Sequence, residues 1–319
     1  MSSPLALLCP GQGAQYPGMA KDLLEYFKKT DVFFEEASDA ISIDLKKLCL
    51  DGPDTELALT FNAQPAILTT SYSWFKVLEE ELGFCPTMSA GHSLGEYSSL
   101  LGSSALTLTE AVKLVRRRGE LMQHAVPVGK GKMAAVLGLE DLVLEKLCQA
   151  ASKPNDLVVP ANYNSPGQIV VAGHATAVDR AQILAQGIEN PEFKAKRFLA
   201  LNVSAPFHCP LMTPVAEKFV DDLRSVRWKT PRYRVWANVD ALEHQESTIA
   251  QKLCAQLDHP VRWTQCTKAM GEAGATHFIE VGPGRVLSGL VKRILEKPSV
   301  FGVDNYQDFQ TLEKEGLCS

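Results

Sequence analysis

A serine between two glycines is the first place in this chain where chemistry is expected. Residues 91 to 95 read Gly91-His92-Ser93-Leu94-Gly95, which matches the G-x-S-x-G pattern of a nucleophile elbow. An elbow holds the serine on a sharp turn between a strand and a helix, where a side chain at either glycine would clash. Residues 85–90 before the motif fit a short buried strand, and residues 96–101 after it read as a helix start. A small-residue turn with a surface serine is the alternative, and the strand-turn-helix context favours the nucleophile.

A base for this serine is sought among the seven histidines. His92 adjoins Ser93, but at a sharp turn its side chain should point away. His124, His244 and His277 stand in ordinary polar contexts, and a lone histidine is usually structural. His208 lies in the Ser/Pro-rich stretch 202–212, after a predicted strand and before a helix that Pro210 can open. An α/β enzyme places its catalytic base in such a loop, so His208 is the candidate.

One arginine lies on the apolar face of a predicted helix. Residues 109–125 have a helical apolar stripe, and Arg118 falls on it, three or four residues from Leu114 and Met122. A buried cation needs an anionic partner, because an unpaired buried charge is costly. The sequence leaves three possibilities open: an internal salt bridge, a side chain that snorkels to solvent, or a ligand carboxylate.

The first glycine-rich segment follows directly on a predicted strand. Residues 5–9 are apolar, and residues 10–15 read Pro-Gly-Gln-Gly-Ala-Gln. Such a loop places backbone amides at the carboxyl edge of a sheet, where ligands bind. The spacing does not match a dinucleotide loop with its acidic ribose partner, so we discount that reading.

The pattern of expected elements divides the chain. Residues 129–199 read as β-α-β-β-α-β, the order of a ferredoxin-like unit, and form an expected inserted subdomain. Residues 1–128 and 200–319 form the expected α/β catalytic domain with a parallel sheet, including a long helix over 64–82 and strands at 234–238 and 276–281. The tail beyond Asp304 is polar and is expected to be peripheral.

Composition excludes several classes of protein. The chain has 319 residues, of which 45% are hydrophobic and 22% charged, as in ordinary globular proteins. Its net charge of -5 gives no case for nucleic-acid binding. The eight cysteines form no C-x-x-C pair, so neither a zinc site nor a disulfide framework is expected. The N-terminus lacks a basic signal region, and no apolar run approaches the ~20 residues that span a bilayer. We therefore expect a cytoplasmic monomer that binds no metal, membrane or nucleic acid.

Several stretches together resemble the malonyl-CoA:acyl-carrier-protein transacylases. They span nearly the whole chain in the family's order and are jointly specific, although each alone is weak: Gly11–Gln15, Gly91–Tyr97, Arg118–Met122, Ser204–His208, Gln256–Leu257 with Pro260–Trp263, and Glu280–Gly284. The resemblance implies an α/β-hydrolase-like core with a ferredoxin-like insertion, which agrees with the order of elements above.

The resemblance also implies roles for individual residues. Ser93 would be the nucleophile and His208 its base, with the backbone N–H groups of Gln12 and Leu94 as the oxyanion hole. Arg118 would bind the malonate carboxylate. A backbone carbonyl near Gln256, rather than a carboxylate, would orient the histidine. Two further residues would contact the acyl group, namely Met122 and Phe207, the latter crowding the α-carbon and disfavouring methylmalonyl.

The implied reaction is ping-pong transfer of malonyl from a coenzyme A thioester to the phosphopantetheine thiol of acyl carrier protein, with no bound cofactor. Carrier proteins are acidic, so a basic surface would help docking. The candidate residues for it are Lys130, Lys132, Lys194, Lys196 and Arg197. The alternative is that these residues are simply charges exposed to solvent. A sister transacylase with another acyl-CoA and a serine esterase are the rival enzymes. A non-catalytic carrier-binding module is disfavoured because the candidate site residues are intact.

Overall fold

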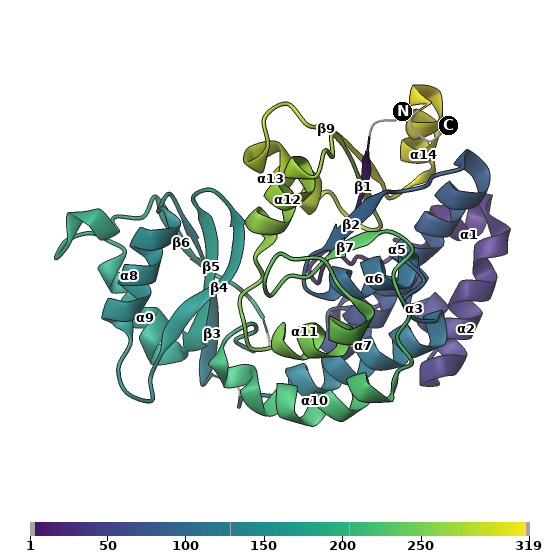
Figure 1. Cartoon of the computed structure of the whole chain (residues 1–319). Coiled ribbons are helices and arrows are strands. Elements are labelled where there is room, and N and C mark those ends of the chain that lie inside the picture. Colours follow the sequence, from purple (N-terminus) through teal and green to yellow (C-terminus); the bar gives the residue numbers. More distant parts are fainter. Residues whose placement is uncertain (1–3, 128, 204, 317–319) are drawn as a thin grey trace.

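The computed structural model describes residues 4–127, 129–203 and 205–316 of the chain. Figure 1 shows two units side by side, each built around its own sheet. The larger sheet has the order β7-β2-β1-β8-β9 and all its pairings are parallel, as the sequence predicts for an α/β fold. Its strands are β1 (Leu5–Cys9), β2 (Met88–Gly91), β7 (Arg234–Trp236), β8 (His277–Val281) and β9 (Ser299–Val303).

Helices cover both faces of this sheet because its central strand is apolar on both sides. Leu5, Leu7 and Cys9 of β1 pack in one cluster with α5 (Thr60–Leu82), α6 (Leu94–Gly102) and α7 (Leu108–Gln123). Ala6 and Leu8 point the other way and pack with α12 (Trp263–Glu272) and α13 (Val286–Ile294). The alternation follows from the two-residue period of a strand and gives three layers.

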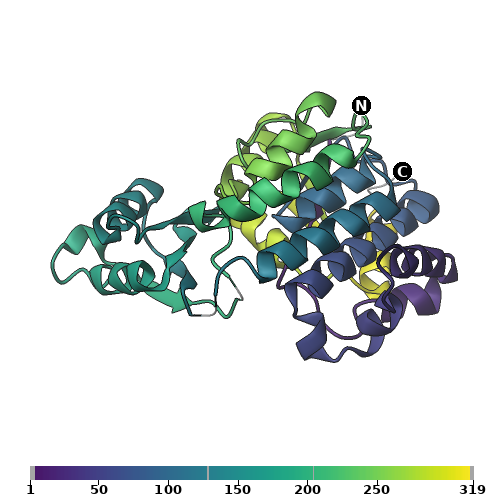
Figure 2. The same ribbon diagram turned by 90° about the horizontal axis from the view of Figure 1, so that it is seen from below.

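The remaining helices surround this core, and the view from below in Figure 2 shows one side of the larger unit covered by helices. They are α1 (Lys21–Tyr26), α2 (Asp31–Ile41), α3 (Leu45–Asp51), α4 (Asp54–Leu57), α10 (Thr213–Ser225), α11 (Ile249–Ala255) and α14 (Tyr306–Glu315). Short 3₁₀ turns occupy residues 28–30, 191–193, 210–212 and 246–248. No helix in the described ranges is long and apolar enough to span a bilayer.

The smaller unit has the predicted ferredoxin-like order of elements. Its antiparallel sheet runs β4-β5-β3-β6. The strands are β3 (Gly131–Leu137), β4 (Val158–Ser165), β5 (Gln168–His174) and β6 (Arg197–Ala200), and the helices are α8 (Asp141–Ala151) and α9 (Ala175–Leu184). The helices pack on one face of this sheet. Met133, Ala161 and Val170 on the other face join the core of the larger unit.

The long helix α5 begins at Thr60, four residues earlier than the sequence predicts, and Pro65 lies inside it. Proline has no N–H, so the carbonyl of Phe61 one turn earlier loses its helical partner. The Nη1 atom of Arg116 on α7 donates to that carbonyl at 3.3 Å. A contact with a distant helix therefore replaces the missing bond, which sequence reasoning could not anticipate.

The prediction of a peripheral tail beyond Asp304 was wrong. Residues 306–315 form α14, whose Phe309 and Leu312 are buried in the main core. The parallel edge strand β9 just before it was also missed. Of the residues in β9 only Val303 is fully buried, so the strand lacks the apolar signal of β1.

Gly119 offers a test of the close packing between α5 and α7. A Cβ at this position would lie 2.5 Å from the Phe61 Cα and 2.8 Å from the Thr60 carbonyl oxygen, both backbone atoms. We expect Gly119→Ala to lower the free energy of unfolding by about 1–3 kcal/mol, the usual cost of overpacking. Gly289→Ala on α13 is the matched control, since its Cβ would meet nothing within 4 Å; it should be neutral or stabilising. Denaturant unfolding measures both, and equal effects would contradict this account.

Candidate active site

The turn at Ser93 requires both of its glycines. Ser93 follows β2 and is the N-cap of α6, with φ 53° and ψ -103°, a strained conformation for a non-glycine residue. A Cβ on Gly91 would lie 1.9 Å from the Gly95 carbonyl carbon, and one on Gly95 would lie 2.0 Å from the Cys9 carbonyl oxygen. The start of α6 therefore packs directly against the carboxyl ends of β1 and β2. The serine projects beyond that edge.

The glycine-rich loop reaches the same edge of the sheet. Cys9 of β1 is in register with Gly91 of β2, and the His92 N–H donates to the Cys9 carbonyl at 3.1 Å. Gln12 in the following loop lines the same cavity as Ser93. Its side-chain Nε2 donates to Thr60 Oγ1 at 3.3 Å, which fixes the loop to the start of α5. The predicted oxyanion loop and the nucleophile are thus brought together.

His208 contacts the serine through the nitrogen that a base would use. Its Nε2 lies 2.8 Å from Ser93 Oγ, and its Nδ1 lies 2.8 Å from the backbone carbonyl oxygen of Gln256. A carbonyl only accepts, so Nδ1 carries the proton and Nε2 presents its lone pair to the hydroxyl. The structure therefore brings together Ser93, His208 and Gln256 as the sequence predicts. Ser204, in the same predicted loop, lies outside the described residues.

The surroundings of His208 keep its imidazole neutral. Burial and, to a smaller extent, the nearby positive charge of Arg118 lower the pKa of His208 to about 3. The Gln256 carbonyl acts in the opposite direction, but more weakly than those two. A neutral imidazole accepts a proton, so this histidine can act as a base throughout the neutral and mildly acidic range.

Arg118 is buried, with 1% of its surface exposed, and it faces the nucleophile. Its Nη2 donates to Ser93 Oγ at 3.0 Å and to the Gln256 side-chain oxygen at 2.9 Å, while its Nη1 donates to Gln64 Oε1 at 2.8 Å. No carboxylate within residues 4–127, 129–203 and 205–316 forms a salt bridge with it, and its Nε is buried without a hydrogen-bond partner there. These contacts exclude snorkelling and an internal salt bridge within the described residues.

A cavity of about 640 Å³ opens in front of these groups. The larger unit contributes Ser93, Arg118 and Met122, and the smaller unit contributes Met133 and Val170. Phe207, buried beside His208, also lines the cavity. Across the described part of the chain, no cluster of His, Cys, Asp and Glu side chains could hold a metal ion. Every predicted substrate-contacting side chain therefore borders this one space.

Sequence reasoning missed the polar side chains behind the serine. Asn238 Oδ1 accepts from the Ser93 N–H at 2.7 Å, and Glu96 accepts from the Asn238 N–H at 2.9 Å. His244, expected in an ordinary polar context, is instead buried against Glu96, with Nε2 2.7 Å from Oε1. Glu96 directly follows the elbow motif in the sequence, and its charge at the start of an otherwise apolar helix was the available signal. Nothing in the sequence marked Asn238 or His244.

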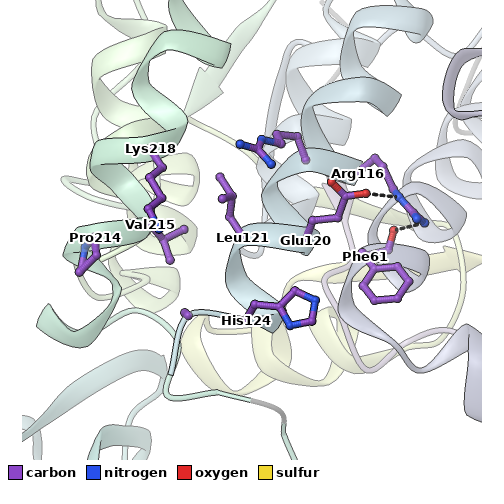
Figure 3. A pocket seen from close by; sticks show the side chains of 10 residues that line it. Phe61, Arg116, Glu120, Leu121, His124, Pro214, Val215 and Lys218 are labelled. Carbon is purple, nitrogen blue, oxygen red and sulfur yellow. Dashed lines mark hydrogen bonds and ion pairs between the residues drawn. The ribbon is translucent and has the colours of Figure 1, made fainter. Parts of the chain in front are cut away.

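A second cavity, of about 520 Å³, lies beside α7 and α10 (Figure 3). Arg116 on its wall binds Glu120, and Arg117 lies 3.5 Å from Asp222. Its arginines are therefore already paired with carboxylates of the chain, in contrast to Arg118. The cavity contains neither the elbow nor its histidine, so the first cavity is the candidate site.

A serine held at an elbow and hydrogen-bonded to a neutral histidine on an α/β fold defines the class of the protein as an acyl-transfer enzyme. The comparisons with known proteins agree. Residues 6–313 match the family model described as acyl transferase domain. The chain is 43% identical over 292 residues to the malonyl CoA-acyl carrier protein transacylase of Escherichia coli strain K12, covering 91% of this chain and 93% of that protein. It is 42% identical over 318 residues to the enzyme of that name from Bacillus subtilis strain 168, covering 98% of each.

Solved structures give the same result. The malonyl-CoA:acyl carrier protein transacylase of Xanthomonas oryzae pv. oryzae superimposes with a TM-score of 0.93 at 40% identity, over 99% of each chain. A malonyl transacylase solved in complex with its type II polyketide synthase acyl carrier protein has a TM-score of 0.93 at 39% identity, over 98% of this chain and 100% of that one. The chain belongs to the malonyl CoA-acyl carrier protein transacylase family and is an acyltransferase.

The charge state of His208 can be measured directly. Because its pKa is lowered to about 3, its ring carbon signals in an NMR titration should not shift between about pH 8 and pH 5, a range that spans the ordinary histidine value. In Arg118→Gln the pKa should rise, because the neighbouring cation is gone while burial remains. His208→Gln identifies the signal by its loss. A midpoint near the ordinary value in the unmodified protein would contradict this electrostatic account.

Proposed function

We propose that the protein transfers the malonyl group of malonyl-CoA to the phosphopantetheine thiol of acyl carrier protein, through a covalent ester on Ser93. The observation that carries this proposal is the guanidinium of Arg118, buried 3.0 Å from the nucleophile without a carboxylate partner among the described residues. A planar guanidinium binds a carboxylate with two parallel hydrogen bonds. The free carboxylate of malonate supplies that partner while its thioester carbon faces Ser93.

In the first half-reaction, Ser93 Oγ attacks the thioester carbon and its proton passes to His208 Nε2 at 2.8 Å. Negative charge develops on the former carbonyl oxygen, and the backbone N–H groups of Gln12 and Leu94 are the proposed donors to it. Collapse of the intermediate breaks the carbon–sulfur bond. The coenzyme A thiolate takes the proton from His208, leaving the malonyl ester on Ser93 and a neutral imidazole.

The second half-reaction repeats these steps with a different thiol. The phosphopantetheine thiol of the carrier gives its proton to His208 and attacks the ester, and Ser93 recovers a proton as the acyl group leaves. The Gln256 carbonyl holds the Nδ1 proton in both halves at 2.8 Å. A carboxylate at that position would favour the imidazolium and place a further negative charge near the bound malonate. The chain itself needs no bound cofactor for this chemistry.

Selectivity for the acyl group follows from the cavity wall. Arg118 and Met122 lie one turn apart on α7 and face the same space. Phe207 adjoins His208 and narrows the space near the reacting carbon, where the extra methyl of methylmalonyl would lie. One methyl group in such a position is worth about 1–3 kcal/mol. We therefore propose malonyl over both acetyl and methylmalonyl.

Carrier docking is proposed on the smaller unit, near the start of β6. The cations proposed for it are Lys194, Lys196 and Arg197, just before or within β6. Lys132 is less available because it binds Asp179 at 2.7 Å. An acidic carrier would be guided by these charges despite the net charge of -5. We further propose that residues 129–199 form a distinct subdomain and that the protein acts as a cytoplasmic monomer.

A sister transacylase for another acyl-CoA would use the same steps and would differ only in the acyl group that binds beside Arg118. A serine esterase shares the elbow but has no use for a buried arginine beside the nucleophile. The arginine therefore favours a substrate with a free carboxylate.

The nucleophile is tested by intact-mass analysis after mixing with malonyl-CoA. The unmodified protein should gain one malonyl group and lose it when carrier protein is added. Ser93→Ala should gain none while remaining folded, because no other hydroxyl contacts His208 within the described structure. Ser98→Ala, further along α6, is the matched control and should still be acylated. A persistent adduct in Ser93→Ala would refute the assignment.

His208→Ala should slow acylation by roughly 10²–10⁴-fold, the range for a positioned base.

Acyl selectivity tests the role of Arg118. An acetyl group has no carboxylate, so its binding leaves the guanidinium desolvated and unpaired. Arg118→Ala should strongly reduce kcat/KM for malonyl-CoA while sparing or raising that for acetyl-CoA. Arg117→Ala, whose side chain is exposed and points to Asp222, is the control and should change neither value. Equal losses for malonyl and acetyl would make Arg118 a structural residue.

A further inference from the structure

Glu96 is fully buried behind the nucleophile and does not line the cavity. It lies in the first turn of α6, three residues after Ser93. Its Oε2 accepts from the Asn238 N–H at 2.9 Å and from Gln256 Nε2 at 2.8 Å, and its Oε1 lies 2.7 Å from His244 Nε2. A carboxylate without solvent is retained only with such partners. Because Glu96 cannot touch a substrate in the cavity, any effect on the reaction must pass through these neighbours.

The first neighbour, Gln256, connects Glu96 to the reacting groups. Its Nε2 donates to Glu96 and to the Ser93 carbonyl at 2.9 Å, while its Oε1 accepts from Arg118 Nη2 at 2.9 Å. A carboxylate accepts only and a guanidinium donates only, so the amide has one satisfactory orientation. Turned over, it would set oxygen against carboxylate and N–H against guanidinium. Glu96 therefore fixes the side chain that holds Arg118 in place.

The second neighbour, Asn238, holds the other side of the strained turn. Its Oδ1 accepts from the Ser93 N–H at 2.7 Å and its Nδ2 donates to the Gly91 carbonyl at 2.8 Å. Together the two amides bind both backbone polar groups of Ser93, whose φ of 53° is unfavourable for a serine. Such strain persists only where the surroundings over-determine it. Glu96 binds both residues, through the side-chain Nε2 of Gln256 and the backbone N–H of Asn238.

Charge gives Glu96 a second effect. Burial lowers the pKa of Arg118, and the charge of Glu96 acts against that lowering. The two opposite charges are linked through the single side-chain amide of Gln256. The resting site is thereby close to neutral without a carboxylate placed on Arg118 itself. The guanidinium face toward Ser93 stays available to a ligand.

We propose that Glu96 is a positioning residue of the acyl-transfer site, oriented by His244 and acting through Gln256 and Asn238 on Ser93 and Arg118. This inference rests on the proposed function, since it concerns the same reaction. It predicts that loss of the carboxylate impairs the chemical step more than the binding of malonyl-CoA. A residue that only supports the fold would lower the amount of active protein and leave the remaining molecules unchanged.

The test is the rate of Ser93 acylation in single-turnover experiments over a range of malonyl-CoA concentrations. Glu96→Gln keeps the shape of the side chain and should fold, as judged by circular dichroism and thermal unfolding. Its acylation rate at saturation should fall by about 10²-fold, the effect of a small misplacement of reacting groups. Its half-saturating concentration should change little. Glu96→Ala, which leaves Gln256 Nε2 and the Asn238 backbone N–H without their shared acceptor, should be slower still.

A second pair of variants tests His244 and does not depend on the folding of Glu96→Gln. His244→Phe removes the donor to Oε1 and should lower the saturating rate with little change in half-saturation. His244→Gln restores a donor and should recover most of the rate. Recovery of this kind separates positioning from bulk packing, because both replacements fill the space.

Glu280→Gln is the matched control for a buried carboxylate. Glu280 is also fully buried and accepts from the Leu287 and Ser288 N–H groups at 3.0 and 2.7 Å, but it contacts neither Ser93 nor Arg118. It should lose stability and keep its saturating acylation rate. The inference is overturned if Glu96→Gln acylates Ser93 at the rate of the unmodified protein. It is also overturned if the decrease in acylation rate is no larger than the decrease in folded protein, or if Glu280→Gln shows the same kinetic change. Absence of any adduct in the unmodified protein would overturn the proposed function as well.

Discussion

The contact between Gly95 and the Cys9 carbonyl is the constraint on which the site depends. No side chain fits at Gly95, because its Cβ would lie 2.0 Å from that oxygen. The first turn of α6 can therefore rest directly on the ends of β1 and β2. This contact sets the nucleophile beyond the two strands and places the Gln12 loop beside it. The sharpness of the turn forces a positive φ on Ser93, and the side-chain amides of Asn238 and Gln256 bind its backbone there.

A second constraint is the buried charge of Arg118. A guanidinium without solvent needs acceptors on several sides, and the structure supplies the neutral oxygens of Gln64, Gln256 and Ser93. These neutral oxygens accept hydrogen bonds from the guanidinium, but they do not neutralise its charge as a direct ion pair would. Glu96 offsets that charge from behind Gln256. The proposed site therefore offers a cation to an anionic acyl group, and no carboxylate among the described residues blocks its nucleophile.

The same arginine explains how the histidine is held. An imidazole near a buried cation is difficult to protonate, and His208 is bound by a carbonyl rather than by an acid. Burial and the cation keep the ring neutral in the resting state and ready to accept a proton, and a carbonyl opposes them less than a carboxylate would. In the proposed reaction the malonate carboxylate offsets the charge of Arg118, so the opposing field weakens and proton transfer to His208 becomes easier once that acyl group is in place.

Much of this organisation is local in the sequence. The elbow is a pattern of five residues, the two-residue period of β1 predicts a strand buried on both faces, and the order of elements over 129–199 predicts the ferredoxin-like unit. Arg118 is visible as a charge on an apolar stripe. Family resemblance added the expected partners of Ser93. In these cases the residues that form the pattern are close together in the sequence, within one helix, strand, turn or short motif.

What only the tertiary structure decided depends on segments far apart in the chain. The hydrogen bond from Arg116 to the Phe61 carbonyl allows a helix to run through Pro65, and the edge position of β9 hides that strand from pattern analysis. The absence of a carboxylate beside Arg118, within the described residues, is a property of its neighbours and not of its helix. Glu96, Asn238 and His244 meet across some 150 residues. A periodic pattern indicates which face of a helix or strand is buried, but it does not indicate which polar atom of a distant segment packs against that face.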